Sequence, residues 1–222
     1  MKNYLIVESI NDKFFLEACL AHLKLNNTEV SNATICGIDD YESMGGLDPE
    51  KLRLAISHLK DKSDKSSEPF NIGIVIDWDG QALSERLALV NTAIQKVFKN
   101  NNNLTAINQF ITVAEDVKMA CYFNGVNGKG ELETVLKEIK SEPSNSANCL
   151  NTWRDCIKPQ NISQKEFDKF WITVYTRYDT CSKKEKNQAQ KNCSFEAAMK
   201  KPIWKFDHPC LQELQAFLTL FS

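Results

Sequence analysis

Four carboxylates follow two short apolar runs, and their spacing points to metal chemistry. Glu8 ends the run NYLIVE, Asp12 comes four residues later, and Asp77 and Asp79 close the run NIGIVIDWD. Because side chains alternate along an extended backbone, Asp77 and Asp79 are expected on the same side, facing one cation. Packed carboxylates repel each other unless a cation or a proton intervenes, so the pattern predicts a Mg²⁺ or Mn²⁺ site. The alternative is that Asp77 and Asp79 only cap the next helix.

The segments around these carboxylates alternate between strand and helix patterns. Apolar, β-branched runs predict strands, and apolar residues spaced by three or four predict helices with one buried face. The expected strands are residues 3–8, 33–38, 71–77, 104–113 and 119–124, and the expected helices are 11–25, 49–60, 83–97 and 131–140. This order predicts an α/β fold with a mainly parallel sheet of about five strands flanked by helices. Ligands bind at the carboxyl ends of parallel strands, which is where Glu8, Asp77 and Asp79 fall.

The C-terminal part of the chain has a helical pattern throughout. A loop is expected at residues 141–148, then helices over 149–157, 163–177 and 184–200, and a last helix with a stripe of apolar residues from Leu211. Asp207-His208-Pro209 is a helix start signal, because Asp or His can cap and Pro suits the first turn. We expect a metal-binding α/β core over residues 1–140 and a helical C-terminal region over 141–222, packed on the core.

Composition limits the classes of protein to which this chain can belong. Its 222 residues are 42% hydrophobic and 25% charged, and the formal net charge of −2 excludes a polybasic nucleic-acid binder. The first apolar run is too short for a signal sequence or a membrane span, so a cytoplasmic protein without a membrane segment is expected. Eight cysteines without a CxxC motif predict reduced, buried thiols in place of a disulfide framework or a zinc cluster.

Two of these motifs resemble a known fold family. The residues LIVES, IND and KFFLEACL, followed by GIVIDWDG, resemble the Toprim fold of topoisomerases, bacterial primases, recombination proteins and overcoming-lysogenization-defect (OLD) nucleases. GELETVL at 130–136 and WKFDHPCLQELQAFL at 204–218 are similar to a compact bacterial family of Toprim/OLD-like, largely uncharacterised proteins known as DUF3226. The resemblance spans nearly the whole chain. One departure is Ser9, which stands where the Toprim pattern usually has glycine after the glutamate.

The resemblance implies metal-assisted phosphoryl transfer on a nucleic-acid backbone. Asp77 and Asp79 would hold a metal, and Glu8 would either bind the metal or move a proton. Glu131 and Glu133 match the position of a second acidic patch, which allows a second metal about 4 Å from the first. The simpler interpretation of these two glutamates is that they are first-turn acids favoured by the helix dipole.

The same relatives use a lysine from the helical region to steady the developing charge. Lys169 is the candidate for this catalytic role, with Lys165 behind it. The alternative for both lysines is an ordinary solvated helix face. Taken together, the metal ligands implied by motif and resemblance are Glu8, Asp12, Asp77, Asp79, Glu131 and Glu133, and the catalytic residues are Glu8 and Lys169.

Three functions follow from these residues. The leading hypothesis is a Mg²⁺- or Mn²⁺-dependent DNA or RNA nuclease or nickase that acts in phage defence or repair. The chain has no P-loop, so an ATPase partner would be another protein. The second hypothesis is a catalytically weak module that binds metal and either nucleic acid or a protein, and a homo-oligomer is compatible with both. The third is a phosphohydrolase that acts on small molecules with the same acidic site.

Overall fold

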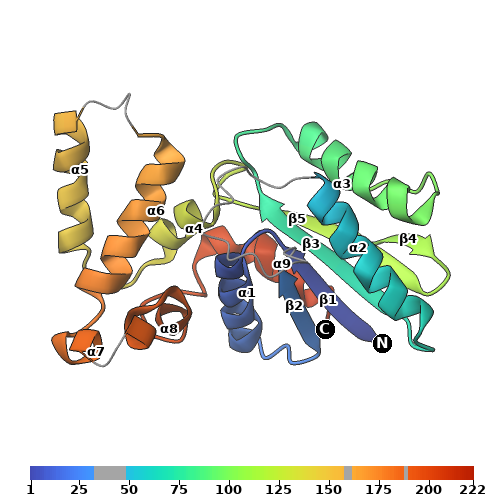
Figure 1. Ribbon diagram of the computed structural model, residues 1–222, viewed down its shortest axis with the longest axis horizontal. Helices are drawn as coiled ribbons and strands as arrows, with labels where there is room; N and C mark the ends of the chain where they lie inside the picture. The colour runs from blue at the N-terminus through green and yellow to red at the C-terminus, as the bar shows by residue number, and fades with distance from the viewer. Residues whose placement is uncertain (33–48, 158–161, 188–189) are drawn as a thin grey trace.

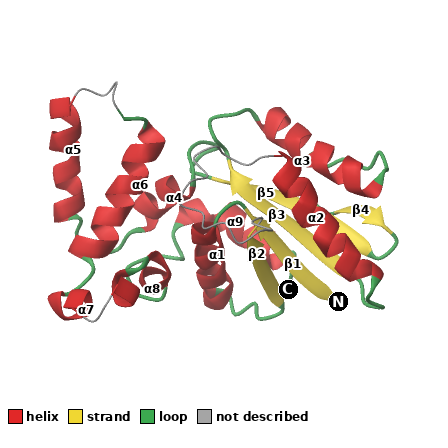
Figure 2. Cartoon of the chain, viewed as in Figure 1, coloured by secondary structure: helices red, strands yellow, loops and turns green. Residues whose placement is uncertain are grey.

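The computed structural model describes residues 1–32, 49–157, 162–187 and 190–222, and its centre is a five-stranded sheet (Figures 1 and 2). The strands are β1 (Lys2–Val7), β2 (Thr28–Asn32), β3 (Phe70–Asp77), β4 (Ile111–Ala114) and β5 (Val117–Asn124), in the order β2-β1-β3-β5-β4. The three pairs β2–β1, β1–β3 and β3–β5 are parallel, and β4 pairs antiparallel with β5. The predicted α/β fold with a mainly parallel sheet of about five strands is confirmed.

Helices cover both faces of this sheet (Figure 1). The helices α2 (Pro49–Asp64) and α3 (Leu83–Phe98) pack on one face in one apolar core. On the other face lie α1 (Ile10–His22) and α9 (Gln212–Thr219), whose buried residues form a second core. Every residue of β3 is buried, because this central strand is covered on both sides.

The remaining helices extend from the carboxyl edge of the sheet. They are α4 (Leu132–Ile139), α5 (Asn145–Ile157), α6 (Gln164–Val174), α7 (Lys183–Asn187) and α8 (Phe195–Met199), with a π-helical turn at Tyr175–Asp179 and 3₁₀ turns at Gln190–Cys193 and Pro209–Leu211. Figure 1 shows α5 to α8 beside the sheet instead of over either face. Within the described part of the chain, no helix has the length and apolar character needed to cross a membrane.

Of two further predicted strands, one falls outside the described residues and the other is shorter than predicted. The predicted strand 33–38 lies outside the described residues, and β2 precedes it. β4 covers only the end of the predicted strand 104–113, because a side chain engages the backbone of Leu104. Asn91 donates to the Leu104 carbonyl oxygen at 2.9 Å and accepts from its N–H at 2.8 Å. These backbone groups are therefore satisfied without a strand partner.

The C-terminal helices have other boundaries than predicted. α5 begins inside the predicted loop 141–148, because the carboxylate of Asp179 accepts two of its first N–H groups at 2.7 and 2.9 Å. The predicted helix 184–200 is interrupted between α7 and α8, and Ser194 caps the start of α8. Asp179 and Ser194 make these contacts with polar side chains, so the spacing of apolar residues does not predict where the helices begin.

The cysteine prediction is wrong in two respects. Cys181 and Cys193 form a disulfide with their Cα atoms 5.9 Å apart, which joins the segment before α7 to the end of the 3₁₀ turn Gln190–Cys193. Of the free thiols in the described residues, Cys19 and Cys121 are buried as expected, whereas Cys149 and Cys156 are exposed. Cys36 lies outside the described residues.

The C-terminal residues complete the core of the sheet. Asn3 in β1 donates from its side chain to the carbonyl oxygen of Phe221 at 2.7 Å. A Cβ at Gly73 in β3 would lie 2.5 Å from a methyl carbon of Leu5 and 2.7 Å from the Phe221 ring, so glycine is what lets this ring approach the strand. The division at residue 140 stays a prediction, because residues on both sides of it share one core.

We predict that Phe217→Ala lowers the free energy of unfolding by about 3–5 kcal/mol, because the ring is fully buried between α9 and β5. Urea unfolding followed by circular dichroism measures this loss. Gln212→Ala on the same helix is the matched control, since its side chain is exposed, and it should change stability by at most about 0.5 kcal/mol. Equal effects of the two substitutions would contradict a core completed by α9.

Candidate metal centre

Six carboxylates gather at the carboxyl edge of the sheet. The acidic cluster consists of Glu8, Asp12, Asp77, Asp79, Glu131 and Glu133, which come from the ends of β1 and β3 and from the starts of α1 and α4. Burial raises the pKa of Asp77 well above its ordinary value, and four other members of the cluster raise it further. The structure thus brings together every carboxylate that the sequence predicted for the site.

A sharp turn after β3 presents Asp77 and Asp79 to one point. Asp77 ends the strand, whereas Asp79 has a left-handed backbone with φ of 50°, and Gly80 follows with φ of 68°. The extended alternation predicted for DWD is therefore wrong beyond Asp77, and the turn brings the two carboxylates together instead. Glycine suits the second left-handed position because it lacks a Cβ.

The start of α4 completes this arrangement from the other side. A Cβ at Gly130, which has φ of 83°, would lie 2.5 Å from the hydroxyl oxygen of Thr134, so glycine lets the chain enter the helix here. Glu131 then stands at the N-cap position, and the N–H of Leu132 donates to Asp77 Oδ1 at 3.2 Å. The partial positive charge of a helix N-terminus favours carboxylates at this place.

The donor set fits a hard divalent cation. Among the described residues, Asp77, Asp79 and Glu131 each offer an oxygen, and these atoms lie within 4.8 Å of one another. Glu8 Oε2 and Glu131 Oε2 are buried without a hydrogen-bond partner. Buried oxygens of this kind are rare unless something satisfies them, and carboxylate oxygens are the ligands that Mg²⁺ and Mn²⁺ prefer. Glu8, Asp12 and Glu133 lie outside the group of three.

Two cationic side chains already reach the acidic cluster. Lys165 of α6 contacts Asp79 Oδ1 at 2.8 Å and Glu131 Oε1 at 3.1 Å. Burial alone would lower the pKa of Lys165, but its bonds to Asp79 and Glu131 raise it above its ordinary value. Arg86 of α3, with only 3% of its side chain exposed, contacts Asp79 Oδ2 at 3.1 Å and donates to the carbonyl oxygen of Asp77. Asp79 is therefore held from both sides.

Sequence reasoning missed Arg86 and Asn124. Arg86 lies on the apolar stripe of α3, beside Leu87 and Val90, and an arginine on a buried face needs a carboxylate or carbonyl partner. The place of Arg86 within this apolar stripe could therefore have identified it from the sequence as a residue with a buried polar partner. Asn124 ends β5 next to Asp77 and donates from its side chain to Asp12 Oδ1 at 3.3 Å. Its signal was its place at the carboxyl end of a parallel strand.

Ser9 has a structural role that explains the absence of glycine. Its hydroxyl caps α1 by accepting the N–H of Asp12 at 3.2 Å, and the hydroxyl and N–H of Ser9 both donate to Asp12 Oδ2, at 2.6 and 3.1 Å. Asp12, only 3% exposed, is thereby fixed as the partner of the helix start. Asp12 is a supporting member of the cluster in this arrangement.

The two predicted lysines occupy different places. Lys169 follows Lys165 by one helical turn on α6, and its charge acts to lower the pKa values of Asp12, Glu131 and Glu133. Lys165 is the one that forms ion pairs with the cluster. The catalytic role assigned to Lys169 stays a prediction.

Burial dominates the proton affinity of the cluster. The pKa of Glu8 is raised to about 7 by burial, followed by the charges of Asp12 and Asp79. The pKa of Glu133 is also raised to about 7 by burial, against the opposing charge of Lys169. Both groups therefore exchange protons near neutral pH in the metal-free protein.

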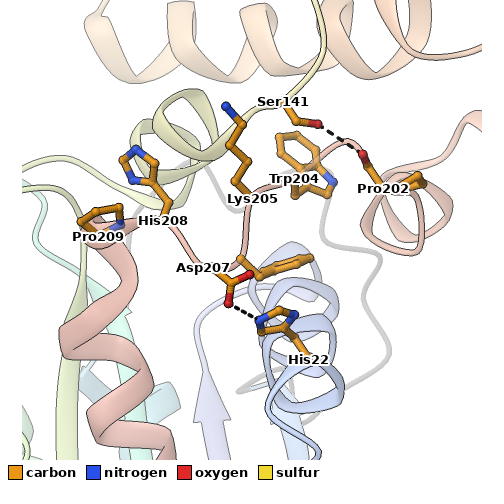
Figure 3. Close-up of a pocket in the computed structure, with 9 residues that line it drawn as sticks. His22, Ser141, Pro202, Trp204, Lys205, Asp207, His208 and Pro209 are labelled. Atoms are coloured by element: carbon orange, nitrogen blue, oxygen red, sulfur yellow. Dashed lines mark hydrogen bonds and ion pairs between the residues drawn. The ribbon is translucent and has the colours of Figure 1, made fainter.

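A separate hollow of about 550 Å³ lies over the segment before the last helix (Figure 3). His208 caps the turn Pro209–Leu211 by accepting the N–H of Cys210 at 3.3 Å, as the start signal predicted. Asp207 does not cap; it contacts His22 Nε2 of α1 at 2.8 Å. The residues that line this hollow are not members of the acidic cluster.

Fold and site define an α/β protein with a buried acidic cluster at the carboxyl edge of a mainly parallel sheet. The chain belongs to the family described as protein of unknown function DUF3226, whose model matches residues 2–222. No curated protein and no solved structure matches it.

We predict that the metal-free protein loses stability as the pH rises from about 5 to about 7. The folded pKa of Glu8 is about 7 against an ordinary 4.5, so the native state binds more protons than the unfolded state across this window. The expected loss of unfolding free energy is about 2 kcal/mol, and Glu8→Gln should reduce it. Urea unfolding at several pH values in EDTA measures it. Stability that rises with pH in this window would contradict the arrangement.

Proposed function

We propose that this protein is a Mg²⁺- or Mn²⁺-dependent phosphodiester hydrolase, a nuclease or nickase that acts on DNA or RNA. The observation that carries the proposal is the convergence of Asp77, Asp79 and Glu131 within 4.8 Å, with a lysine on the same group. Hydrolysis of a charged phosphodiester needs positive charge at the phosphate and a proton acceptor near the attacking water. The acidic cluster and its neighbours offer candidates for both.

The roles follow from the environment of each side chain. Asp77, Asp79 and Glu131 would hold the cation, which when bound supplies Lewis-acid polarisation of a phosphoryl oxygen. Glu8, with the unpartnered Oε2 and a pKa near 7, suits a group that accepts the proton of the attacking water. Lys165, whose ammonium contacts Asp79, would stabilise negative charge at the reacting phosphate.

The resemblance to Toprim and OLD proteins supports the same chemistry. The strand-terminal Glu8 and the motif Asp77-Trp78-Asp79 are the residues that carry it. From this resemblance we also propose a role in phage defence or repair beside a separate ATPase. The second lysine of α6, Lys169, and the second pair of acids, Glu131 and Glu133, belong to the same proposal.

One observation favours a second candidate function. Arg86 and Lys165 both contact Asp79, so part of the negative charge is already neutralised by the protein itself. A cation would have to compete with the ammonium of Lys165 for Asp79 and Glu131. A catalytically weak module that binds metal and nucleic acid or a protein would fit this internal neutralisation.

We predict that the purified protein cleaves supercoiled plasmid or single-stranded nucleic acid when Mg²⁺ or Mn²⁺ is present. Asp77→Asn should reduce cleavage at least about 100-fold, because it removes a candidate ligand at the centre of the cluster. Asp116→Asn is the matched control, since this exposed aspartate precedes β5 at the opposite edge of the sheet. Gel electrophoresis of the products over time measures the rates.

Two outcomes separate the candidate functions. Cleavage that is absent, or that survives both Asp77→Asn and Glu8→Gln, contradicts the nuclease. Calorimetry then decides the binding module, which requires metal uptake that depends on Asp77 without turnover. A protein that takes up no Mg²⁺ or Mn²⁺ at millimolar concentrations contradicts both functions.

A further inference from the structure

Two large aromatic side chains lie exposed on α5 and α6, and α6 also carries the lysine that contacts the acidic cluster. Trp153 of α5 is 40% exposed and Phe170 of α6 is 43% exposed. Their ring centroids are 5.7 Å apart with an interplanar angle of 68°, so they form an edge-to-face pair at the surface. Trp171, which follows Phe170, is buried by contrast. The exposed pair leaves aromatic surface open to a ligand.

The exposed face of α6 connects this pair to the acidic cluster. Lys165 and Lys169 are one turn apart on the border next to the cluster, while Phe170 lies about 100° further around the helix. The rise from Lys165 to Phe170 along the helix axis is about 7.5 Å, and the two residues lie about 140° apart around the axis, so a few nucleotides would connect them. Glu166 also lies on this face, but Ser163 holds its carboxylate with two hydrogen bonds of 2.6 and 2.9 Å.

Charge is distributed unevenly along the chain. Residues 141–222 contain 12 lysines and arginines against 9 acidic residues, whereas residues 1–140 contain 15 against 20. The part of the chain that carries the aromatic pair is therefore the positive part of an otherwise acidic protein. An uneven charge of this kind suits a polyanion that must approach an acidic site.

We propose that Trp153 and Phe170 form a base-stacking platform for single-stranded nucleic acid, with Lys169 on the adjoining phosphates. The inference rests on the proposed function, because it takes the substrate to be a nucleic acid. Exposed aromatic rings beside lysines bind single strands by stacking bases of any sequence, whereas the bases of a duplex are already stacked on one another. The substrate class is therefore single-stranded DNA or RNA, or an unpaired segment of a duplex.

The test measures binding in EDTA, so that cleavage plays no part. Fluorescence anisotropy of a labelled oligothymidylate, an oligouridylate and a duplex of equal length gives the three affinities. Trp153→Ala and Phe170→Ala should each weaken single-strand binding about tenfold and change duplex binding little. Leu54→Ala on α2 is the matched control, because Leu54 is 41% exposed and lies over the sheet, away from α5 and α6. Circular dichroism checks that each variant is folded.

Trp153→Phe gives a second readout. Of the four tryptophans, Trp171 and Trp204 are buried and Trp78 packs edge-on against Phe123, so Trp153 is the exposed one. Addition of oligothymidylate should quench the fluorescence of the wild-type protein. In Trp153→Phe the quench should disappear while the affinity stays within about threefold, because a ring remains for stacking.

Each other outcome overturns the proposal. Unchanged single-strand affinity in both alanine variants does so, as does equal weakening of duplex binding or an absence of nucleic-acid binding by the wild type. A change in oligomeric state by sedimentation velocity, without a change in affinity, would identify a protein interface instead. If the alanine variants weaken single-strand binding but no cleavage depends on Asp77, only the nuclease proposal is contradicted. If cleavage depends on Asp77 but neither alanine variant changes single-strand binding, only the platform is contradicted.

Discussion

Mutual repulsion among six buried or partly buried carboxylates is the constraint on which this structure depends. The parallel strands β1 and β3 end at one edge, so the residues that follow them cannot avoid one another. The fold offsets part of this charge with the N-terminus of α4, with Arg86 and with Lys165. Burial raises the pKa values of Glu8 and Glu133 to about 7, and the charges of neighbouring carboxylates add to this effect, so the ionised forms are still unfavourable.

Local sequence patterns predicted the elements that carry the first carboxylates. The run before Glu8, the run before Asp77 and the stripe from Leu87 along α3 each produced an element at its predicted place. Because the carboxyl ends of parallel strands share one edge, the proximity of Glu8 to Asp77 and Asp79 could be predicted without knowledge of tertiary contacts. The meeting of Glu131 with Asp77 and Asp79 was expected only from the resemblance and is now seen in the geometry.

Long-range contacts account for what the sequence did not predict. Lys165 meets Asp79 from 86 residues away, and no pattern along the chain distinguishes it from Lys169 one turn later. The sequence pattern did not identify Arg86, because the buried face of a helix is recognised by its apolar residues. The disulfide and the early start of α5 likewise join segments that the chain brings together only after folding. The spacing of apolar residues describes one helix or strand at a time, so it does not predict contacts between residues of different elements.

Diffraction from crystals grown with millimolar Mn²⁺, recorded to measure anomalous scattering, would show whether the acidic cluster binds a cation. We expect a peak bonded to oxygens of Asp77, Asp79 and Glu131 at about 2.1 Å, with the ammonium of Lys165 displaced from at least one of them. A cluster without an anomalous peak, with Lys165 still paired to Asp79 and Glu131, would contradict this expectation. In that case the lysine would be the cation for which the site is built.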